Sequence, residues 1–136
     1  MMSKAALACV LGCLPTLTAA DACSNINAFA LHGISKAAHG VEAQCTMSRV
    51  LGAGRSEDCF WRYPLRSGKA QHHFDSLLED LRNCADGRLN VEATGVNHPD
   101  SFDQVTAQVA GIAVSLSLKD KGGLSETLVV LRRQIP

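Results

Sequence analysis

Apolar residues recur at helical spacing in two segments of the chain. After Ser67 they form a continuous stripe at intervals of three and four residues, made of Ala70, Phe74, Leu77, Leu78, Leu81 and Ala85. Ser67 begins this helix, and Gly87 stands where a left-handed C-terminal cap would end it. A weaker pattern covers 24–38, with Gly40 as its terminator and Gly33 as a weakening residue inside it. The spacing therefore predicts two amphipathic helices.

Two further segments alternate between apolar and polar positions, which is the pattern of a half-buried strand. In the segment 41–47 the odd positions are apolar and the even positions are polar. The segment 52–57 predicts a loop, after which Cys59, Trp61 and Tyr63 share one face of a second strand. We expect the two strands to form a hairpin, with Trp61 and Tyr63 beneath the second helix.

The last third of the chain predicts three more strands. The segment 89–93 alternates in the same way. Along 105–118 the apolar residues move from odd to even positions near Gly111, which predicts a β-bulge. Residues 119–123 predict a hairpin turn, and 124–132 a final strand whose apolar centre indicates burial on both faces.

The order of these elements predicts the fold class. Strands joined by short turns form antiparallel sheets, and two amphipathic helices must bury their apolar stripes against something apolar. The sequence therefore predicts a two-layer α+β fold, in which two helices cover one face of an antiparallel sheet of about five strands. The expected order is helix, strand, strand, helix and three strands.

The segment 1–20 has the three parts of a secretory signal. Lys4 supplies the positive charge, 5–14 is apolar, and 16–20 consists mostly of small residues. The apolar run is about ten to thirteen residues long, whereas a membrane-spanning helix needs about twenty, so we expect no stable transmembrane span. The remaining 21–136 is expected to be a single exported domain.

Three processing sites remain open within this signal. Cleavage after Ala20 is favoured, and cleavage after Ala22 would leave Cys23 as the first residue. A third alternative is lipid attachment at Cys13, because Gly12 and the residues before it resemble a bacterial lipobox. The domain is expected to be periplasmic or secreted, and lipid attachment would tether it to a membrane.

The cysteines predict two disulfides. Cys9 and Cys13 belong to the signal, and four cysteines remain in the exported part: Cys23, Cys45, Cys59 and Cys84. An oxidising compartment favours two bridges among these four, for which three pairings exist.

The expected hairpin geometry selects one pairing. A hairpin closed around 52–57 would separate Cys45 from Cys59 by about 16 to 18 Å, which is too far for a disulfide. A second helix that folds back over the second strand would bring Cys84 to Cys59. The geometry therefore predicts the bridges Cys59–Cys84 and Cys23–Cys45.

Charge and motifs argue against several functions. The chain has 13 basic and 13 acidic residues, and removal of Lys4 with the signal leaves 12 against 13, a net charge of −1. Nucleic-acid binding is not expected without a basic face. No cofactor is expected, because 52–54 lacks the helix and lysine of a phosphate-binding loop. No metal site is expected, because His72 and His73 are adjacent on an exposed helix face and point about 100° apart.

Two surfaces are candidates for binding. Phe60 and Arg62 lie on the opposite strand face from Trp61 and offer an aromatic-plus-arginine pair of the kind that interfaces favour. The second surface is a polar loop with a central aromatic side chain, whose candidate binding residues are His98, Asp100, Phe102 and Asp103.

These observations favour a non-enzymatic binding module of the inhibitor or immunity type, with an unknown protein or small ligand as its partner. One alternative is a small hydrolase or metal-dependent enzyme that uses His98 and Asp100 with a helix histidine. Another alternative is a structural component of the cell envelope.

Overall fold

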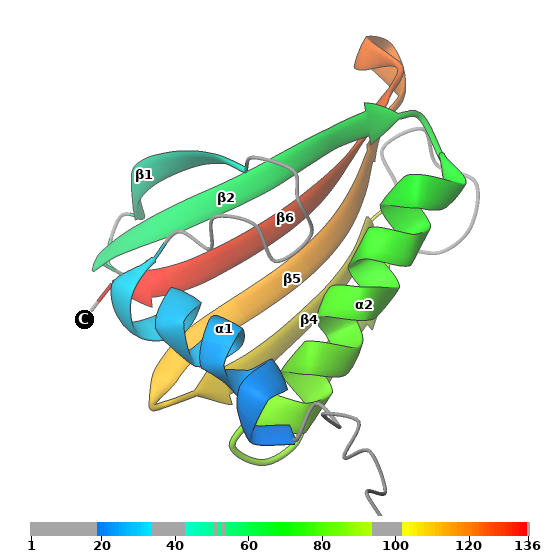
Figure 1. The fold of residues 1–136 in the computed structure, drawn as a ribbon. Coiled ribbons are helices and arrows are strands. Elements are labelled where there is room, and N and C mark those ends of the chain that lie inside the picture. Colours follow the sequence, from blue (N-terminus) through cyan, green and yellow to red (C-terminus); the bar gives the residue numbers. More distant parts are fainter. Residues whose placement is uncertain (1–18, 34–42, 51, 53, 94–101, 136) are drawn as a thin grey trace, which may run out of the picture.

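The computed structural model describes residues 19–33, 43–50, 52, 54–93 and 102–135, which form two helices and six strands (Figure 1). In chain order, these are α1 (Ala19–His32), β1 (Gln44–Val50), β2 (Gly54–Pro64), α2 (Gly68–Cys84), β3 (Asn90–Ala93), β4 (Phe102–Val109), β5 (Ile112–Lys121) and β6 (Glu126–Ile135). A short 3-10 helix, Gly122–Leu124, connects β5 to β6. Nearly all of the predicted signal, together with His98 and Asp100, lies outside the described residues.

The strands form one antiparallel sheet in the order β1-β2-β6-β5-β4-β3. The last strand, β6, lies in the interior of the sheet between β2 and β5. Both helices cover one face of the sheet (Figure 1). The predicted α+β class and the placement of both helices on one face are confirmed, and the sheet has six strands instead of about five.

The additional strand arises at Gly111, where the sequence predicted a bulge. Ala110 and Gly111 both have positive φ angles, +49° and +77°, and they form a two-residue turn between β4 and β5. Val109 is directly opposite Ile112 in the resulting hairpin. The bulge prediction was wrong, because the turn places residues 109 and 112 on the same face and thereby moves the apolar residues from odd to even positions.

The first hairpin also turns at a different place from the one predicted. Val50 is opposite Gly54, and most of the predicted loop 52–57 belongs to β2. This register places Cys45 directly opposite Cys59, with a Cα–Cα distance of 4.0 Å, and the two form a disulfide. The expected distance of about 16 to 18 Å between Cys45 and Cys59 was wrong, because it was calculated for a hairpin whose loop was residues 52–57.

The second disulfide joins the two helices. Cys23 of α1 bonds to Cys84, the last residue of α2, with a Cα–Cα distance of 5.2 Å. The expected pairing of Cys59 with Cys84 and of Cys23 with Cys45 is therefore wrong, although the four participating cysteines are those expected. The helices pack side by side, which brings Cys23 to the end of α2 instead of to β1.

The helix α1 begins before Ser24 and ends earlier than the predicted 38. Gly33 adopts φ +73°, and its N–H donates a 2.8 Å hydrogen bond to the carbonyl of Phe29. A Cβ atom at this position would collide with the carboxylate of Glu57 and the guanidinium of Arg133. Only glycine fits here without strain, so the residue that seemed to weaken the helix is the one that ends it.

The helix α2 follows the prediction closely. The Ser67 side chain accepts a 3.2 Å hydrogen bond from the backbone N–H of Ala70, which caps the first turn. The helix ends at Cys84, because Ala85 already has extended backbone angles. Gly87 has the expected positive φ, +93°, but lies in the loop beyond the helix.

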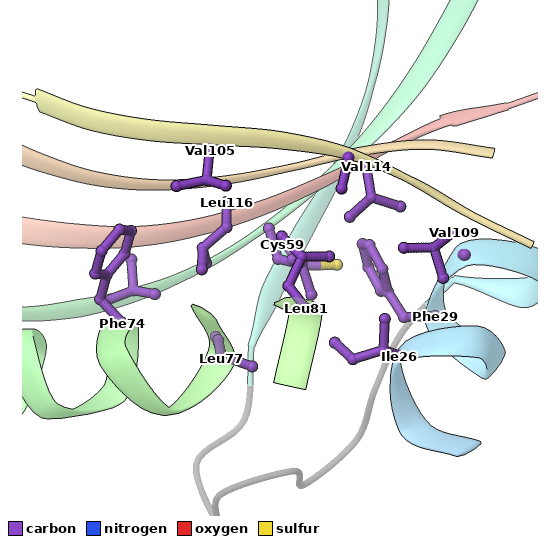
Figure 2. Packing of buried hydrophobic residues seen from close by; sticks show 14 of the residues in the cluster. Ile26, Phe29, Cys59, Phe74, Leu77, Leu81, Val105, Val109, Val114 and Leu116 are labelled. Atoms are coloured by element: carbon purple, nitrogen blue, oxygen red, sulfur yellow. The ribbon is translucent and has the colours of Figure 1, made fainter. Parts of the chain in front are cut away.

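The core lies between the helices and the sheet (Figure 2). Ile26 and Phe29 enter it from α1, and Leu77 and Leu81 enter it from α2. The strands contribute the buried residues of their alternating pattern, among them Cys59, Trp61, Val105, Val109, Val114, Leu116, Val129 and Leu131. Full burial of one such large apolar side chain contributes about 1.5–3 kcal/mol, so this layer fixes the helices on the sheet.

Trp61 and Tyr63 lie beneath α2, as predicted. The Trp61 ring makes an edge contact with the imidazole of His73 at a centroid distance of 4.6 Å. The Tyr63 hydroxyl lies 2.7 Å from Nδ1 of the same imidazole. His73 is only 5% exposed, so the expectation of an exposed His73 was wrong, whereas His72 is exposed. The two adjacent histidines differ because one follows the core-facing stripe of the helix.

Candidate functional site

One polar row crosses all six strands on the face of the sheet away from the helices. Successive strand pairs place its members directly opposite one another, in the order Asn90, Thr106, Ser115, Arg132, Asp58 and Thr46. We call this face the outer face. Apolar side chains occupy the alternate positions of the same strands and form the core on the other face. The outer face therefore carries a continuous polar band in place of a second core.

The outer face is hollowed around the Thr106–Ser115–Arg132 part of this row. The hollow has a volume of about 360 Å³. Its lining comes from five strands and the loop after α2, and consists of Gly54, Arg55, Ser56, Arg88, Asn90, Gln104, Thr106, Ala107, Gln108, Ala113, Val114, Ser115, Arg132 and Gln134. We call this set the outer hollow. Ten of these fourteen residues carry an amide, hydroxyl or guanidinium group, and no carboxylate belongs to the lining.

Arg132 is held rigidly at the centre of the row. Its Nε donates to Oδ1 of Asp58 at 2.6 Å, and its Nη2 donates to Oδ2 at 2.8 Å. This bidentate pairing raises the pKa of Arg132 and leaves the other guanidinium N–H groups to a ligand. Asp58 lies on the side of Arg132 away from β5 and does not line the hollow.

A second arginine of the lining has no counterion. Arg88 is exposed and forms no ion pair with another residue in the described part of the chain. Since Asp58 neutralises Arg132, Arg88 gives the hollow a net positive charge. The chain as a whole has no excess of basic residues, so this charge is local. Arg55 adds no charge to this face, because alternation along β2 places its side chain on the helix side with Glu57 and Cys59.

The predicted surface around Phe60 lies on the same outer face, next to the hollow. Phe60 is opposite Val130, and Arg62 is opposite Leu128. The Arg62 guanidinium carbon lies 5.3 Å from the centroid of the Phe60 ring, and its Nη1 forms a 2.7 Å ion pair with Glu126. The aromatic ring and the guanidinium thus contact each other. Phe60, Val130 and Leu128 are half-buried and form an apolar rim beside the polar row on this face.

Lys119 belongs to the same rim. It lies opposite Leu128 of β6 and opposite Phe102, the first residue of β4. Burial, and then the nearby charges of Arg132 and Lys121, lower the pKa of Lys119. The strand register therefore brings the positions of Phe102, Lys119, Leu128 and Arg62 into one row across four strands, so that two of the sequence-predicted sites share a face.

Asp103 belongs to a different cavity. This second cavity, of about 310 Å³, lies between the start of α2 and the strands β4, β5 and β6, on the helix-covered side. At its edge, Asp120 accepts a 3.1 Å ion pair from Arg66 and a 2.7 Å hydrogen bond from the Thr127 hydroxyl. Asp103 is thus separated from Phe60 and Arg62, and His98 and Asp100 lie outside the described residues.

The described residues contain no group of three His, Cys, Asp or Glu side chains arranged to hold a metal ion. Neither cavity is lined by a histidine or a cysteine. No helix in the described segments is long and apolar enough to cross a membrane. The two disulfides are typical of a protein that folds in an oxidising compartment.

Sequence reasoning missed the outer hollow. Its signal is present in the alternate positions of two strands, which hold Gln104, Thr106 and Gln108 in β4 and Ala113, Ser115 and Ser117 in β5. Small and polar residues in such a pattern fit a face without a helix. The turn at Gly111 places the polar residues of β4 directly opposite those of β5. The predicted bulge treated the two strands as one, so this pairing was not expected.

Comparison with known protein families, with curated proteins and with solved structures finds no match to this chain.

Proposed function

We propose that the protein is a non-enzymatic binding module, exported into an oxidising compartment, that holds a small hydrophilic ligand in the outer hollow. The observation that carries this proposal is the hollow itself, a polar cavity on a sheet face that no described helix covers. Its volume of about 360 Å³ lies within the range of small-molecule sites, about 300–1000 Å³. Of the two partner classes open from the sequence, a protein and a small ligand, the hollow favours the small ligand.

The lining supports a hydrophilic ligand. Most small-molecule sites are lined by apolar and aromatic side chains, with few polar groups. Here Asn90, Gln104 and Gln108 present amides that both donate and accept hydrogen bonds, and Thr106 and Ser115 add hydroxyls. A ligand without many polar groups would leave these groups unsatisfied on binding, which costs free energy. A hydroxyl-rich ligand satisfies them.

The rigidity of the floor supports binding over chemistry. The strands β4, β5 and β6 lie inside the sheet and are paired on both sides, and Asp58 fixes the central arginine by two hydrogen bonds. A serine or threonine hydroxyl needs an adjacent base to act as a nucleophile, and the lining of the outer hollow, which has such hydroxyls, contains no histidine, carboxylate or lysine to serve as one. Phe60, Arg62 and the position of Phe102 lie on the outer face and remain predicted contacts for a larger ligand, as do His98 and Asp100, whereas Asp103 belongs to the second cavity.

The test is a binding screen by nuclear magnetic resonance with the oxidised, isotopically labelled protein. The library consists of neutral and charged sugars, amino acids, nucleotides and organic acids. We expect ligands to shift the backbone amide signals of Asn90, Thr106, Ser115 and Arg132, while the α2 signals stay in place. Ligands that shift only helix signals, or a library without any ligand for the hollow, would contradict the proposal.

A blocked variant gives the control. Thr106→Trp fills the hollow with a side chain that suits a strand, and it should abolish the shifts that the ligands cause. Lys69→Trp places the same side chain on the exposed surface of α2 and should leave binding unchanged. Thermal unfolding of both variants verifies that they remain folded. Equal binding by the two variants would place the ligand elsewhere.

A further inference from the structure

The charge of the outer hollow is one-sided. Its lining includes the side chains of Arg88 and Arg132, and no carboxylate belongs to it. The Asp58 carboxylate compensates Arg132 from outside the hollow. Arg88 has no such compensation among the residues that the structure describes. A bound anion would therefore supply the negative charge that the lining lacks.

The two arginines come from different parts of the chain. Arg88 stands in the loop between α2 and β3, and Arg132 lies on β6 between β2 and β5. Guanidinium groups present a planar fork of donors that matches the oxygens of a carboxylate or a phosphate. The neutral polar residues Thr106 and Ser115 lie on the strands between them.

We propose that the ligand of the outer hollow is a small acidic sugar, whose carboxylate or phosphate lies against Arg88 and Arg132 and whose hydroxyls contact the amides. This inference rests on the proposed function. The amide side chains of Asn90, Gln104 and Gln108, together with the Thr106 and Ser115 hydroxyls, provide both donors and acceptors for sugar hydroxyls. The cavity volume of about 360 Å³ suits a ligand of this class.

The experiment compares three probes that share one sugar ring: glucose, glucuronate and glucose 6-phosphate. Each is titrated into the oxidised protein, and the shifts of the hollow amide signals give the dissociation constant. We expect at least one charged probe to bind about tenfold more tightly than glucose, since a hydrogen bond to a charged group contributes about 1.5–3 kcal/mol. Comparison of glucuronate with glucose 6-phosphate identifies the preferred anionic group.

One variant connects this preference to Arg88. Arg88→Gln should weaken binding of the charged probe by about tenfold or more and reduce the preference of the hollow for that probe over glucose. Arg82→Gln on α2 is the matched control, because it removes the same charge from an exposed position outside the hollow. Both replaced arginines are exposed, so we expect the variants to fold.

The outcomes separate this inference from the proposed function. Equal binding of glucose and of the charged probes at the hollow signals would overturn the acidic ligand and leave the binding module standing. Charged probes that bind with undiminished affinity to the Arg88→Gln variant would also overturn it. If the charged probes do not shift the hollow signals while other library ligands do, the inference fails alone. If no library ligand shifts them, both proposals fail.

Discussion

Cys45 and Cys59 face each other across β1 and β2 and are joined by a disulfide. This bridge closes a short segment, because its cysteines are 14 positions apart, whereas Cys23 and Cys84 are 61 positions apart. The pairing is directly testable. Proteolysis of the unreduced protein followed by mass spectrometry should yield a peptide pair that links Cys45 to Cys59. A pair that links Cys59 to Cys84 would refute the register of the first hairpin.

The two bridges should contribute unequally to stability. In the chain-entropy model, closing the longer loop of the Cys23–Cys84 bridge is worth about 4 kcal/mol, and closing the shorter loop of the Cys45–Cys59 bridge about 3 kcal/mol. Replacing both cysteines of a bridge with alanine should therefore lower the free energy of unfolding more for Cys23–Cys84. Urea unfolding of the two double variants measures the difference. The reverse order would show that packing at the hairpin outweighs loop entropy.

Gly33 should not tolerate a side chain. Gly33→Ala must place a Cβ atom against Glu57 and Arg133 while keeping φ at +73°. We expect a loss of about 1–3 kcal/mol in the free energy of unfolding. Gly123→Ala is the control, because Gly123 has open space around its Cβ position and no positive φ, and it should change stability little. Similar losses in both variants would argue against a strained end of α1.

Neutralising the acidic residue should destabilise the protein more in a buried ion pair than in an exposed one. Glu57 and Arg133 each keep 11% side-chain exposure, whereas Arg62 and Glu126 keep 49% and 31%. Glu57→Gln leaves a buried guanidinium without its counter-charge and should cost about 3 kcal/mol or more. Glu126→Gln, the same chemical change on the outer face, should cost about 1 kcal/mol or less. Chemical unfolding compares the two, and a larger loss for Glu126→Gln would contradict the assigned burial.

The lowered pKa of Lys119 should make the free energy of unfolding depend on pH. Burial, and then Arg132 and Lys121, lower its pKa from 10.5 in the folded state, although Asp58 opposes the shift. Between the lowered folded pKa and 10.5, the unfolded chain binds more protons at this site than the folded chain, so stability rises with pH there. At neutral pH the charge on Lys119 therefore lowers the free energy of unfolding. The variant Lys119→Met, which removes this charge, should be more stable.

The difference in the free energy of unfolding between Lys119→Met and the unchanged protein should decrease as the pH rises through the lowered pKa toward 10.5. Urea unfolding of both proteins at a series of pH values measures it, with Lys69→Met on the exposed surface of α2 as a control for the general removal of a lysine. A constant advantage across this range would refute the coupling to Lys119.

The export signal also makes a prediction. If cleavage follows Ala20, the mature protein begins at Asp21, and most of α1 is retained. N-terminal sequencing of the exported protein distinguishes this site from cleavage after Ala22. Lipid attachment at Cys13 would instead yield a protein labelled by radioactive palmitate. Failure of the chain to leave the cytoplasm would contradict the predicted signal and remove the basis for its compartment.

The sequence predicts elements well where local signals agree. The apolar stripe of α2 and its Ser67 cap coincide, so that helix begins where expected. The first hairpin was predicted less well. Its turn lies two or three residues from the predicted position, and such a displacement changes every cross-strand pair. Residues 54–57 have the polarity of a loop, yet Ser56 and Glu57 are buried in β2 by their contacts with neighbouring elements. Pairing is a tertiary property that local polarity does not encode.

The candidate site illustrates the same limit. Phe60 and Arg62 could be placed on the outer face by alternation alone, and the structure places them there. The outer hollow depends on residues from five strands and on Arg88, and no single strand contains its pattern. Its arginines are separated by more than thirty positions from one another and resemble ordinary surface charges until the register is known. The sequence therefore reveals single contacts but not the cavity.

The interior position of β6 has a consequence for the order of folding. Before the last strand is available, β1 and β2 form one hairpin and β3, β4 and β5 form a separate meander, and no strand pairing joins them. The inner edges of β2 and β5 are then unpaired, with free backbone groups that can bind other chains. The six-stranded sheet closes only when residues 126–135 enter between the two halves. A chain that emerges from its amino terminus, as in synthesis, therefore cannot close its sheet until these last residues are available.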